Sequence, residues 1–383
     1  MERIPVFDVR LEAAHVEAVA ETLRSGWLTL GPRTTAFEAE FAEHLGVPHA
    51  VALSSCTAAL HLAYLAAGVG PGDEVVVPGI TFVATAAAAR YCGGTAVLAE
   101  IVGPHDLSLD PEDVEARLTP RTKAVCAVHY AGYAAPLGPL RNLCAERGVA
   151  LIEDAAHSPS ATTPGGDELL GTVGLAGAFS FFSNKIISCG EGGLLATRDE
   201  RVAELARSLR SHAMTSGTWD RHRGHAMGYD VVGVGYNYRM DEPRAALLSA
   251  RLPGLAADVA ERRRLTHLYR AALADVPGVT VPYSDAQVDA SSCYIMPVML
   301  DEPALRDPLR SYLADRHGIQ TTVLYPSINE FSAYADGPGA GSLPRCEHAA
   351  RAQLTLPLYP HLGEERQDRV VRALRDGLAE LSV

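Results

Sequence analysis

Residues 123–154 read KAVCAVHYAGYAAPLGPLRNLCAERGVALIED, two short apolar runs that flank a longer segment. The runs at 123–128 and 149–152 have the length and composition of buried strands, and residues 136–147 space their apolar side chains as a helix does. A strand, a crossover helix and a second strand form a βαβ unit, in which both strands run parallel in one sheet. This stretch therefore predicts a parallel sheet.

The same alternation extends from about residue 49 to residue 200. We expect further strands at 49–53, 74–77, 95–98, 177–182 and 193–196, and helices at about 57–67, 81–91 and 111–118. The pattern predicts an α/β fold with a mostly parallel sheet that is covered on both faces. Ligands of such sheets bind outside the carboxyl ends of the strands.

The segments on either side of this core do not show the regular alternation of strands and helices. Two amphipathic stretches, 8–24 and 33–45, come before it, and a helix at 241–250 comes after it. Then follow a long helix at 255–275, a strand near 293–300, a helix near 304–317, a loop rich in Gly, Pro and Ser at 326–344, and a final helix at 364–380. We predict a large domain over 1–252, with the N-terminal helices, and a smaller α+β domain over 253–383.

Composition excludes several classes of function. The formal net charge is −13 and only 6% of residues are aromatic, so a nucleic-acid partner is not expected. The charged N-terminus MERIPVFDVR is unlike a secretory signal, and no run of about 18 apolar residues could span a membrane. We expect a soluble, cytoplasmic protein. The seven cysteines are scattered without a C-x-x-C pair, so neither a disulfide framework nor a zinc site is indicated.

The sequence lacks the signatures of several common enzyme sites. There is no G-x-x-x-x-G-K-[ST] loop, no G-x-S-x-G elbow and no H-E-x-x-H. The glycines at 68, 70 and 72 precede a strand, which is the wrong context for a dinucleotide loop. His212, His222 and His225 lie in a glycine-rich loop without a carboxylate at ligand spacing, so we predict no metal site.

Three clusters of reactive side chains follow expected strands. The strand at 49–53 is followed by Ser54-Ser55-Cys56-Thr57, and the strand at 149–152 by Glu153-Asp154-Ala155-Ala156-His157. The strand at 177–182 contains Ser180 and is followed by Ser183-Asn184-Lys185. Because the carboxyl ends of parallel strands share one edge of the sheet, these clusters are expected to converge on one site.

Lysine usage singles out one member of these clusters. Of the 33 basic residues only Lys123 and Lys185 are lysines. A lysine amine can lose its proton and condense with an aldehyde, whereas a guanidinium stays protonated. Lys185 is therefore a candidate for a Schiff-base lysine. Lys123 leads into a strand and fits a surface role better.

The other clusters supply groups that would complement a phosphorylated aromatic aldehyde. Asp154 could pair with a pyridinium nitrogen, or could simply cap a helix. Cys56 and Thr57, which follow Ser55, are expected to begin a helix whose backbone amides could bind a phosphate. The same residues could equally serve only as the N-cap of that helix. Phe82 could stack on a flat ring or belong to the core. Together these groups meet the requirements of pyridoxal 5′-phosphate (PLP).

The sequence resembles the DegT/DnrJ/EryC1/StrS family of sugar aminotransferases over nearly the whole chain. Matching stretches include SGWLTLGPRTTAFEAEFAEHLGV, SSCTAALHLA, ALIEDAAHS and GYNYRMDEPRAAL, and the most specific is the run from Phe179 to Gly193 within FSFFSNKIISCGEGGLLAT. The resemblance implies the aspartate-aminotransferase-like fold, fold type I of PLP enzymes, for the large domain.

The resemblance also implies roles for individual residues. Lys185 would form the Schiff base with PLP, Asp154 would face its pyridine nitrogen, and His157 would contact its ring oxygen. The remaining implied contacts are Phe82 stacked on the ring, Cys56, Thr57 and Ser180 around the phosphate, and Tyr325 near the sugar pocket. The family pattern further implies a homodimer with the active site at the interface, where Asn237 reaches the phosphate of the neighbouring subunit.

Three positions depart from the family pattern. Cys56 stands where glycine is usual, Leu98-Ala99-Glu100-Ile101 replaces an acidic signature, and His157 stands where glutamine is also common. None of these departures removes a chemical group that the reaction requires.

The resulting hypothesis is a PLP-dependent transaminase that moves an amino group from glutamate or glutamine to a ketosugar. The resemblance implies a nucleotide-linked 3- or 4-keto-deoxysugar, in secondary-metabolite or glycan biosynthesis. A cyclitol ketone as acceptor, a PLP-dependent sugar dehydratase and a non-catalytic PLP-binding protein stay open as alternatives. Members of the dehydratase branch carry histidine at the position of Lys185, which disfavours that reading.

Overall fold

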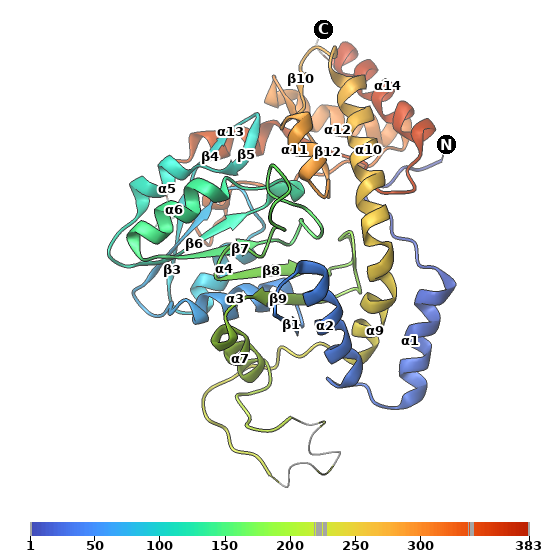
Figure 1. Cartoon of the computed structure of the whole chain (residues 1–383). Coiled ribbons are helices and arrows are strands. Elements are labelled where there is room, and N and C mark those ends of the chain that lie inside the picture. Colours follow the sequence, from blue (N-terminus) through green and yellow to red (C-terminus); the bar gives the residue numbers. More distant parts are fainter. Residues whose placement is uncertain are drawn as a thin grey trace.

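A seven-stranded sheet forms the centre of the protein, in the order β1-β9-β8-β7-β6-β2-β3 (Figure 1). The computed structural model describes residues 2–217, 219, 224, 228–335, 337 and 341–381. The strands are β1 (His49–Leu53), β2 (Glu74–Pro78), β3 (Thr95–Ala99), β6 (Thr122–Val128), β7 (Ala150–Asp154), β8 (Ala176–Ser180) and β9 (Gly193–Thr197). Only β9 pairs antiparallel with its neighbours, β1 and β8. The prediction of a mostly parallel sheet is confirmed.

Helices cover both faces of this sheet. Successive residues of a strand therefore point into two different hydrophobic clusters, one on each face. Val75 on β2 belongs to one hydrophobic cluster, which includes α3 (Cys56–Ala66), whereas Val76 belongs to a second cluster with α5 (Pro111–Arg117) and α6 (Leu137–Arg147). On β7, Ile152 and Leu151 divide in the same way. The near-continuous apolar runs in the sequence therefore reflect burial on both sides.

A second, three-stranded sheet follows, in the order β10-β11-β12. Its strands are β10 (Val279–Thr280), β11 (Met296–Leu300) and β12 (Gln353–Leu356), and the helices beside it are α11 (Asp285–Ala290), α12 (Arg306–His317), α13 (Pro344–Ala352) and α14 (Glu364–Leu381). The N-terminal segment joins this part, since the Ile4 N–H donates to Gly318 O (2.9 Å) and the Gln320 N–H to Ile4 O (2.8 Å). The domain boundary at 252/253 stays a prediction.

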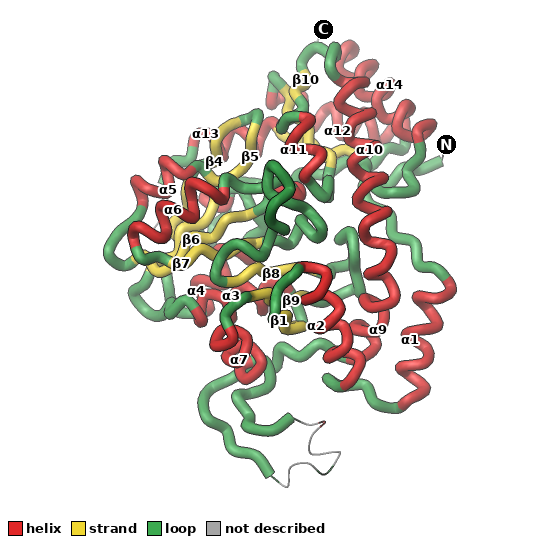
Figure 2. Tube along the Cα trace, viewed as in Figure 1, coloured by secondary structure: helices red, strands yellow, loops and turns green. Residues whose placement is uncertain are grey.

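Four helices stand along one flank of the strands: α1 (Ala13–Ser25), α2 (Pro32–Leu45), α9 (Glu242–Arg251) and α10 (Leu255–Leu273) (Figure 2). A buried carboxylate joins two of them. Glu242, which is 1% exposed, accepts hydrogen bonds from the N–H groups of Gly31 (2.9 Å), Arg33 (2.7 Å) and Thr34 (2.8 Å). These amides begin α2 and have no partner within the helix, so Glu242 acts as its cap from a distant part of the chain.

Several elements were not expected from the sequence. One is a hairpin of β4 (Ile101–Gly103) and β5 (Asp106–Leu109). It begins at the end of the segment 98–101, which departs from the family signature. The helices α4 (Ala84–Tyr91) and α7 (Glu200–Leu209) complete the large sheet's cover, and of these α7 was not predicted. None of the helices that the structure describes is both long and apolar enough to cross a lipid bilayer.

Candidate active site

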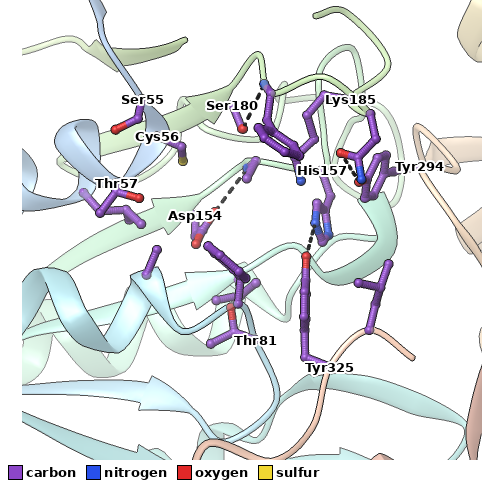
Figure 3. Close-up of a pocket in the computed structure, with 18 of the residues that line it drawn as sticks. Ser55, Cys56, Thr57, Thr81, Asp154, His157, Ser180, Lys185, Tyr294 and Tyr325 are labelled. Carbon is purple, nitrogen blue, oxygen red and sulfur yellow. Dashed lines mark hydrogen bonds between the residues drawn. The ribbon is translucent and has the colours of Figure 1, made fainter. Parts of the chain in front are cut away.

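A cavity of about 370 Å³ lies at the carboxyl ends of β7 and β8, next to the first turn of α3 (Figure 3). The structure brings together in its lining every site residue expected from the sequence except Asn237. These lining residues are Cys56, Thr57, Phe82, Asp154, His157, Ser180, Lys185 and Tyr325. The cavity is thus at the edge of the sheet where ligands of parallel sheets bind.

One corner of the cavity is built for an anion. Ser55 caps α3, since its Oγ accepts the Ala58 N–H (3.1 Å), and the other amides of the first turn have no partner within the helix. The backbone of β9 lies directly against this turn, because a Cβ on Gly193 would meet the Ser55 carbonyl carbon at 2.2 Å and the Cys56 nitrogen at 2.3 Å. Burial raises the pKa of the Cys56 thiol well above its usual range, which keeps it neutral.

Asp154 ends β7 and points into the cavity. Its Oδ2 accepts a hydrogen bond from Thr85 Oγ1 (2.7 Å) and its Oδ1 accepts the Ala156 N–H (3.2 Å). Burial raises the pKa of Asp154, and these hydrogen bonds oppose the rise. Its neighbour Glu153 faces the other way, where it accepts the Gly171 N–H (2.8 Å). Strand alternation therefore assigns one carboxylate to the cavity and the other to the fold.

Lys185 lies in the loop that follows β8 and is 9% exposed. The backbone N–H of Lys185 donates to Phe182 O (2.9 Å). The guanidinium of Arg251 on α9 fixes the next part of the loop by donating to Ser188 O (2.8 Å). Burial lowers the pKa of Lys185 to about 8, although the nearby Cys56 and Asp154 act in the opposite direction. The amine therefore loses its proton far more readily than an ordinary lysine.

Aromatic rings form the wall beside the lysine. His157 Nδ1 accepts the Ala131 N–H (3.2 Å), so the ring proton is on Nε2, which donates to the Tyr325 hydroxyl (3.2 Å). Burial and the Lys185 charge hold the pKa of His157 well below its usual range, so the ring is neutral. Phe82 lies 5.7 Å from Tyr325, centroid to centroid, and is 54% exposed. An exposed aromatic ring at a cavity mouth is available for stacking on a ligand.

Three lining or supporting residues were not found by reasoning from the sequence. Thr85 supports Asp154, Thr81 hydrogen-bonds to Thr85 (2.9 Å), and Tyr294 lies beneath Lys185 with its hydroxyl on Asn184 (2.9 Å). The spacing of the two threonines, four residues apart at the start of a helix, was a usable signal. Tyr294 gave none, because it comes from the segment before β11.

The histidines considered as metal ligands can be assessed only in part. His222 and His225 lie outside the described residues, while His212 is described. In the described portion of the chain, no group of three or more His, Cys, Asp or Glu side chains could hold a metal ion.

The residues in the cavity fit PLP group by group. The Asp154 carboxylate is buried, and a protonated pyridine nitrogen would give it a cationic partner. The first turn of α3 suits the phosphate, Phe82 the ring face, and the Lys185 amine the aldehyde. Because no lysine or arginine occurs from 34 to 89, the helix amides are this segment's means of binding an anion.

Comparisons with known proteins agree with this fit. The model of the DegT/DnrJ/EryC1/StrS aminotransferase family matches residues 9–375. The chain is 37% identical to a dTDP-3-amino-3,4,6-trideoxy-alpha-D-glucose transaminase of Streptomyces venezuelae, covering 98% of this chain and 96% of that protein. It is 36% identical to the spore coat polysaccharide biosynthesis protein SpsC of Bacillus subtilis, covering 94% and 93%. The crystal structure of the aminotransferase TlmJ from Streptoalloteichus hindustanus matches with a TM-score of 0.90 at 38% identity, covering 99% of this chain and all of that one.

Proposed function

The chain belongs to the DegT/DnrJ/EryC1/StrS aminotransferase family, and from this premise we propose that it transfers an amino group from glutamate or glutamine to a nucleotide-linked keto-deoxysugar. The protein is a PLP-dependent sugar aminotransferase. The names of its relatives support the nucleotide-linked acceptor, since one acts on a dTDP-linked sugar and another serves polysaccharide synthesis. The product would enter a secondary metabolite or a glycan.

One observation carries the proposal. A buried lysine amine and a buried carboxylate, Lys185 and Asp154, lie in one cavity at adjacent strand ends. Bound PLP would supply an aldehyde carbon that takes up the amino group and a ring that delocalises the electron pair released at the donor's Cα. Lys185 Nζ would accept the proton from that Cα and deliver it to the former aldehyde carbon of the cofactor, a role that the lowered pKa of the amine favours. Asp154 would keep the ring nitrogen protonated.

A half-reaction tests the assignment. The PLP-loaded protein is mixed with glutamate or glutamine in the absence of an acceptor, and the 2-oxo acid is measured by mass spectrometry. We expect one 2-oxo acid per active site from the correct donor, because the amino group stays on the cofactor until a ketone arrives. Adding a nucleotide-linked ketosugar should then allow continued release. A protein that only binds PLP would release no 2-oxo acid, and a cyclitol-specific enzyme would release it continuously only with a cyclitol ketone.

We also propose that the enzyme is a homodimer in which Asn237 of the partner subunit completes the phosphate site. Asn237 is exposed and does not line the cavity of its own chain. Its neighbours Tyr236 and Tyr238 turn toward His61, with ring centroids 4.8 and 5.9 Å from it, and the Ser54 N–H donates to Tyr238 O (2.8 Å). The segment is thus fixed beside its own phosphate loop while Asn237 stays available to a second chain.

The preceding residues support this dimer. Val231, Val232 and Val234 are 52%, 66% and 89% exposed, an apolar run that a second copy would cover. In the lining that the structure describes, Lys185 is the only lysine or arginine, so a dianionic phosphate would gain from further donors.

Mixing two variants tests the origin of Asn237, at a PLP concentration too low to load either variant alone with active cofactor. Asn237→Ala should weaken PLP binding about 10- to 100-fold, the effect of one hydrogen bond to a charged group. When this variant is refolded together with Lys185→Ala, a hybrid dimer should regain one intact site, with Lys185 from one chain and Asn237 from the other. Activity that stays absent in the purified hybrid would place Asn237 in the site of its own chain.

A further inference from the structure

Tyr294 contacts the lysine loop from the opposite part of the protein. Its ring centroid lies 4.4 Å from Lys185 Nζ, and its hydroxyl donates to Asn184 Oδ1 (2.9 Å), one residue before the lysine (Figure 3). The ring is 1% exposed and stacks on His157 at 4.3 Å between centroids. Tyr294 therefore contacts both the amine and the histidine that face the cavity.

Other contacts fix the backbone and the ring of Tyr294 as well. Its backbone N–H donates to Ala131 O (2.9 Å), and its carbonyl accepts a hydrogen bond from Arg262 of α10 (3.1 Å). Phe7 of the N-terminal segment also stacks with the ring, with centroids 5.7 Å apart and planes 17° apart. Held in this way, the ring cannot move away from the amine without breaking several contacts.

We propose that Tyr294 is a positioning residue for Lys185. When the lysine is not attached to the cofactor, the ring of Tyr294 attracts its protonated amine and keeps the amine in place, while the hydroxyl fixes the loop that carries the lysine. The face of an aromatic ring is negative and attracts a cation most strongly where water is excluded. In the proposed reaction Lys185 would be a free amine while the amino donor is bound, and would hold the proton taken from the donor's Cα close to the cofactor. This part of the argument rests on the proposed function, whereas the contact itself does not.

Competitive labelling of the cofactor-free protein tests the proposal without using activity. Trace acetic anhydride is applied across a range of pH values, and the modification of each lysine is measured by peptide mass spectrometry. Only the unprotonated amine reacts, so the midpoint gives the pKa of Lys185. Lys123, the only other lysine, has a side chain that is 45% exposed and serves as the reference within the same sample.

Three proteins separate the ring from the hydroxyl. We expect a midpoint near pH 8 for the wild type, since burial lowers the pKa of Lys185 to about 8. Tyr294→Leu should lower it by about one pH unit, because the attraction for the ammonium is lost. Tyr294→Phe keeps the ring and should leave the midpoint unchanged. The other ionisable groups around the amine, Asp154, Cys56, His157 and Glu191, are the same in all three.

A variant of nearly the same shape guards against misfolding of Tyr294→Leu. Pentafluorophenylalanine at position 294 has a reversed ring charge distribution and should lower the Lys185 midpoint relative to Tyr294→Phe, while the midpoint of Lys123 stays constant. Equal midpoints for the fluorinated and unfluorinated rings would overturn the proposal, as would an equal fall in Tyr294→Phe and Tyr294→Leu. If instead the proposed function is wrong, 2-oxo acid release fails in the wild type while these midpoint shifts remain.

Discussion

Lys185→Ala should reduce transamination by about 10⁴-fold or more, because the residue would serve both as the attachment point for PLP and as the base that moves the Cα proton. The visible absorption band of the bound cofactor should shift or disappear. Borohydride treatment of the wild-type holoprotein, followed by peptide mapping, should find the cofactor attached at position 185.

The chain offers a matched control for this experiment. Lys123→Arg removes the only other lysine, which lies on the surface 4.0 Å from Asp73. It should leave the absorption band, the borohydride adduct and turnover as in the wild type. Unmodified Lys185 in the peptide map, or full turnover by Lys185→Ala, would reject the role assigned to this residue.

Asp154→Ala should lower kcat by about 10²- to 10⁴-fold, with a smaller effect on the binding of the amino donor. The carboxylate would stabilise the protonated pyridine nitrogen, and without this charge the ring would be a much weaker acceptor of the electron pair from Cα. The measurements are the half-reaction rate with the amino donor and the absorption spectrum. Thr85→Val, which removes only one hydrogen bond to Asp154, should cost about fivefold.

A modified cofactor distinguishes a charge effect from a structural one. PLP methylated at the ring nitrogen carries a permanent positive charge, so it should restore part of the activity of Asp154→Ala and none of the activity of Lys185→Ala. If the methylated cofactor binds Asp154→Ala but does not raise its rate, Asp154 has a role other than maintaining the charge of the ring.

The large sheet could be predicted from the sequence because its strands are buried on both faces. Apart from Lys123, the runs 123–128 and 149–152 are apolar at every position, and each became a strand within one or two residues of the expected bounds. The reversed direction of β9 was not predicted. Local sequence does not encode strand direction, which is defined only once β9 pairs with β1 and β8.

Of the site residues, those at the ends of strands could be predicted from the sequence, whereas those brought in by tertiary packing could not. Asp154 ends a strand, and Cys56 and Lys185 come within a few residues after one, so the topology of a parallel sheet was enough to bring them together. Tyr294 and Thr85 meet them only through tertiary packing. The hairpin at 101–109 was missed because its strands, Ile101–Gly103 and Asp106–Leu109, are too short to show a clear periodicity. Helix α7 was missed although its buried residues Val202, Ala203 and Ala206 are spaced as on one face of a helix.

The link between Tyr294 and the lysine loop also has a consequence for biosynthesis. Asn184 and Tyr294 are 110 positions apart, and Phe7, the first of these rings to leave the ribosome, can stack only after Tyr294 has emerged. A nascent chain that already contains Asp154 and Lys185 therefore still lacks the wall behind the amine. We expect vitamin B6 to be captured late, after translation has passed the second sheet, so that stalled ribosomes would carry chains without it.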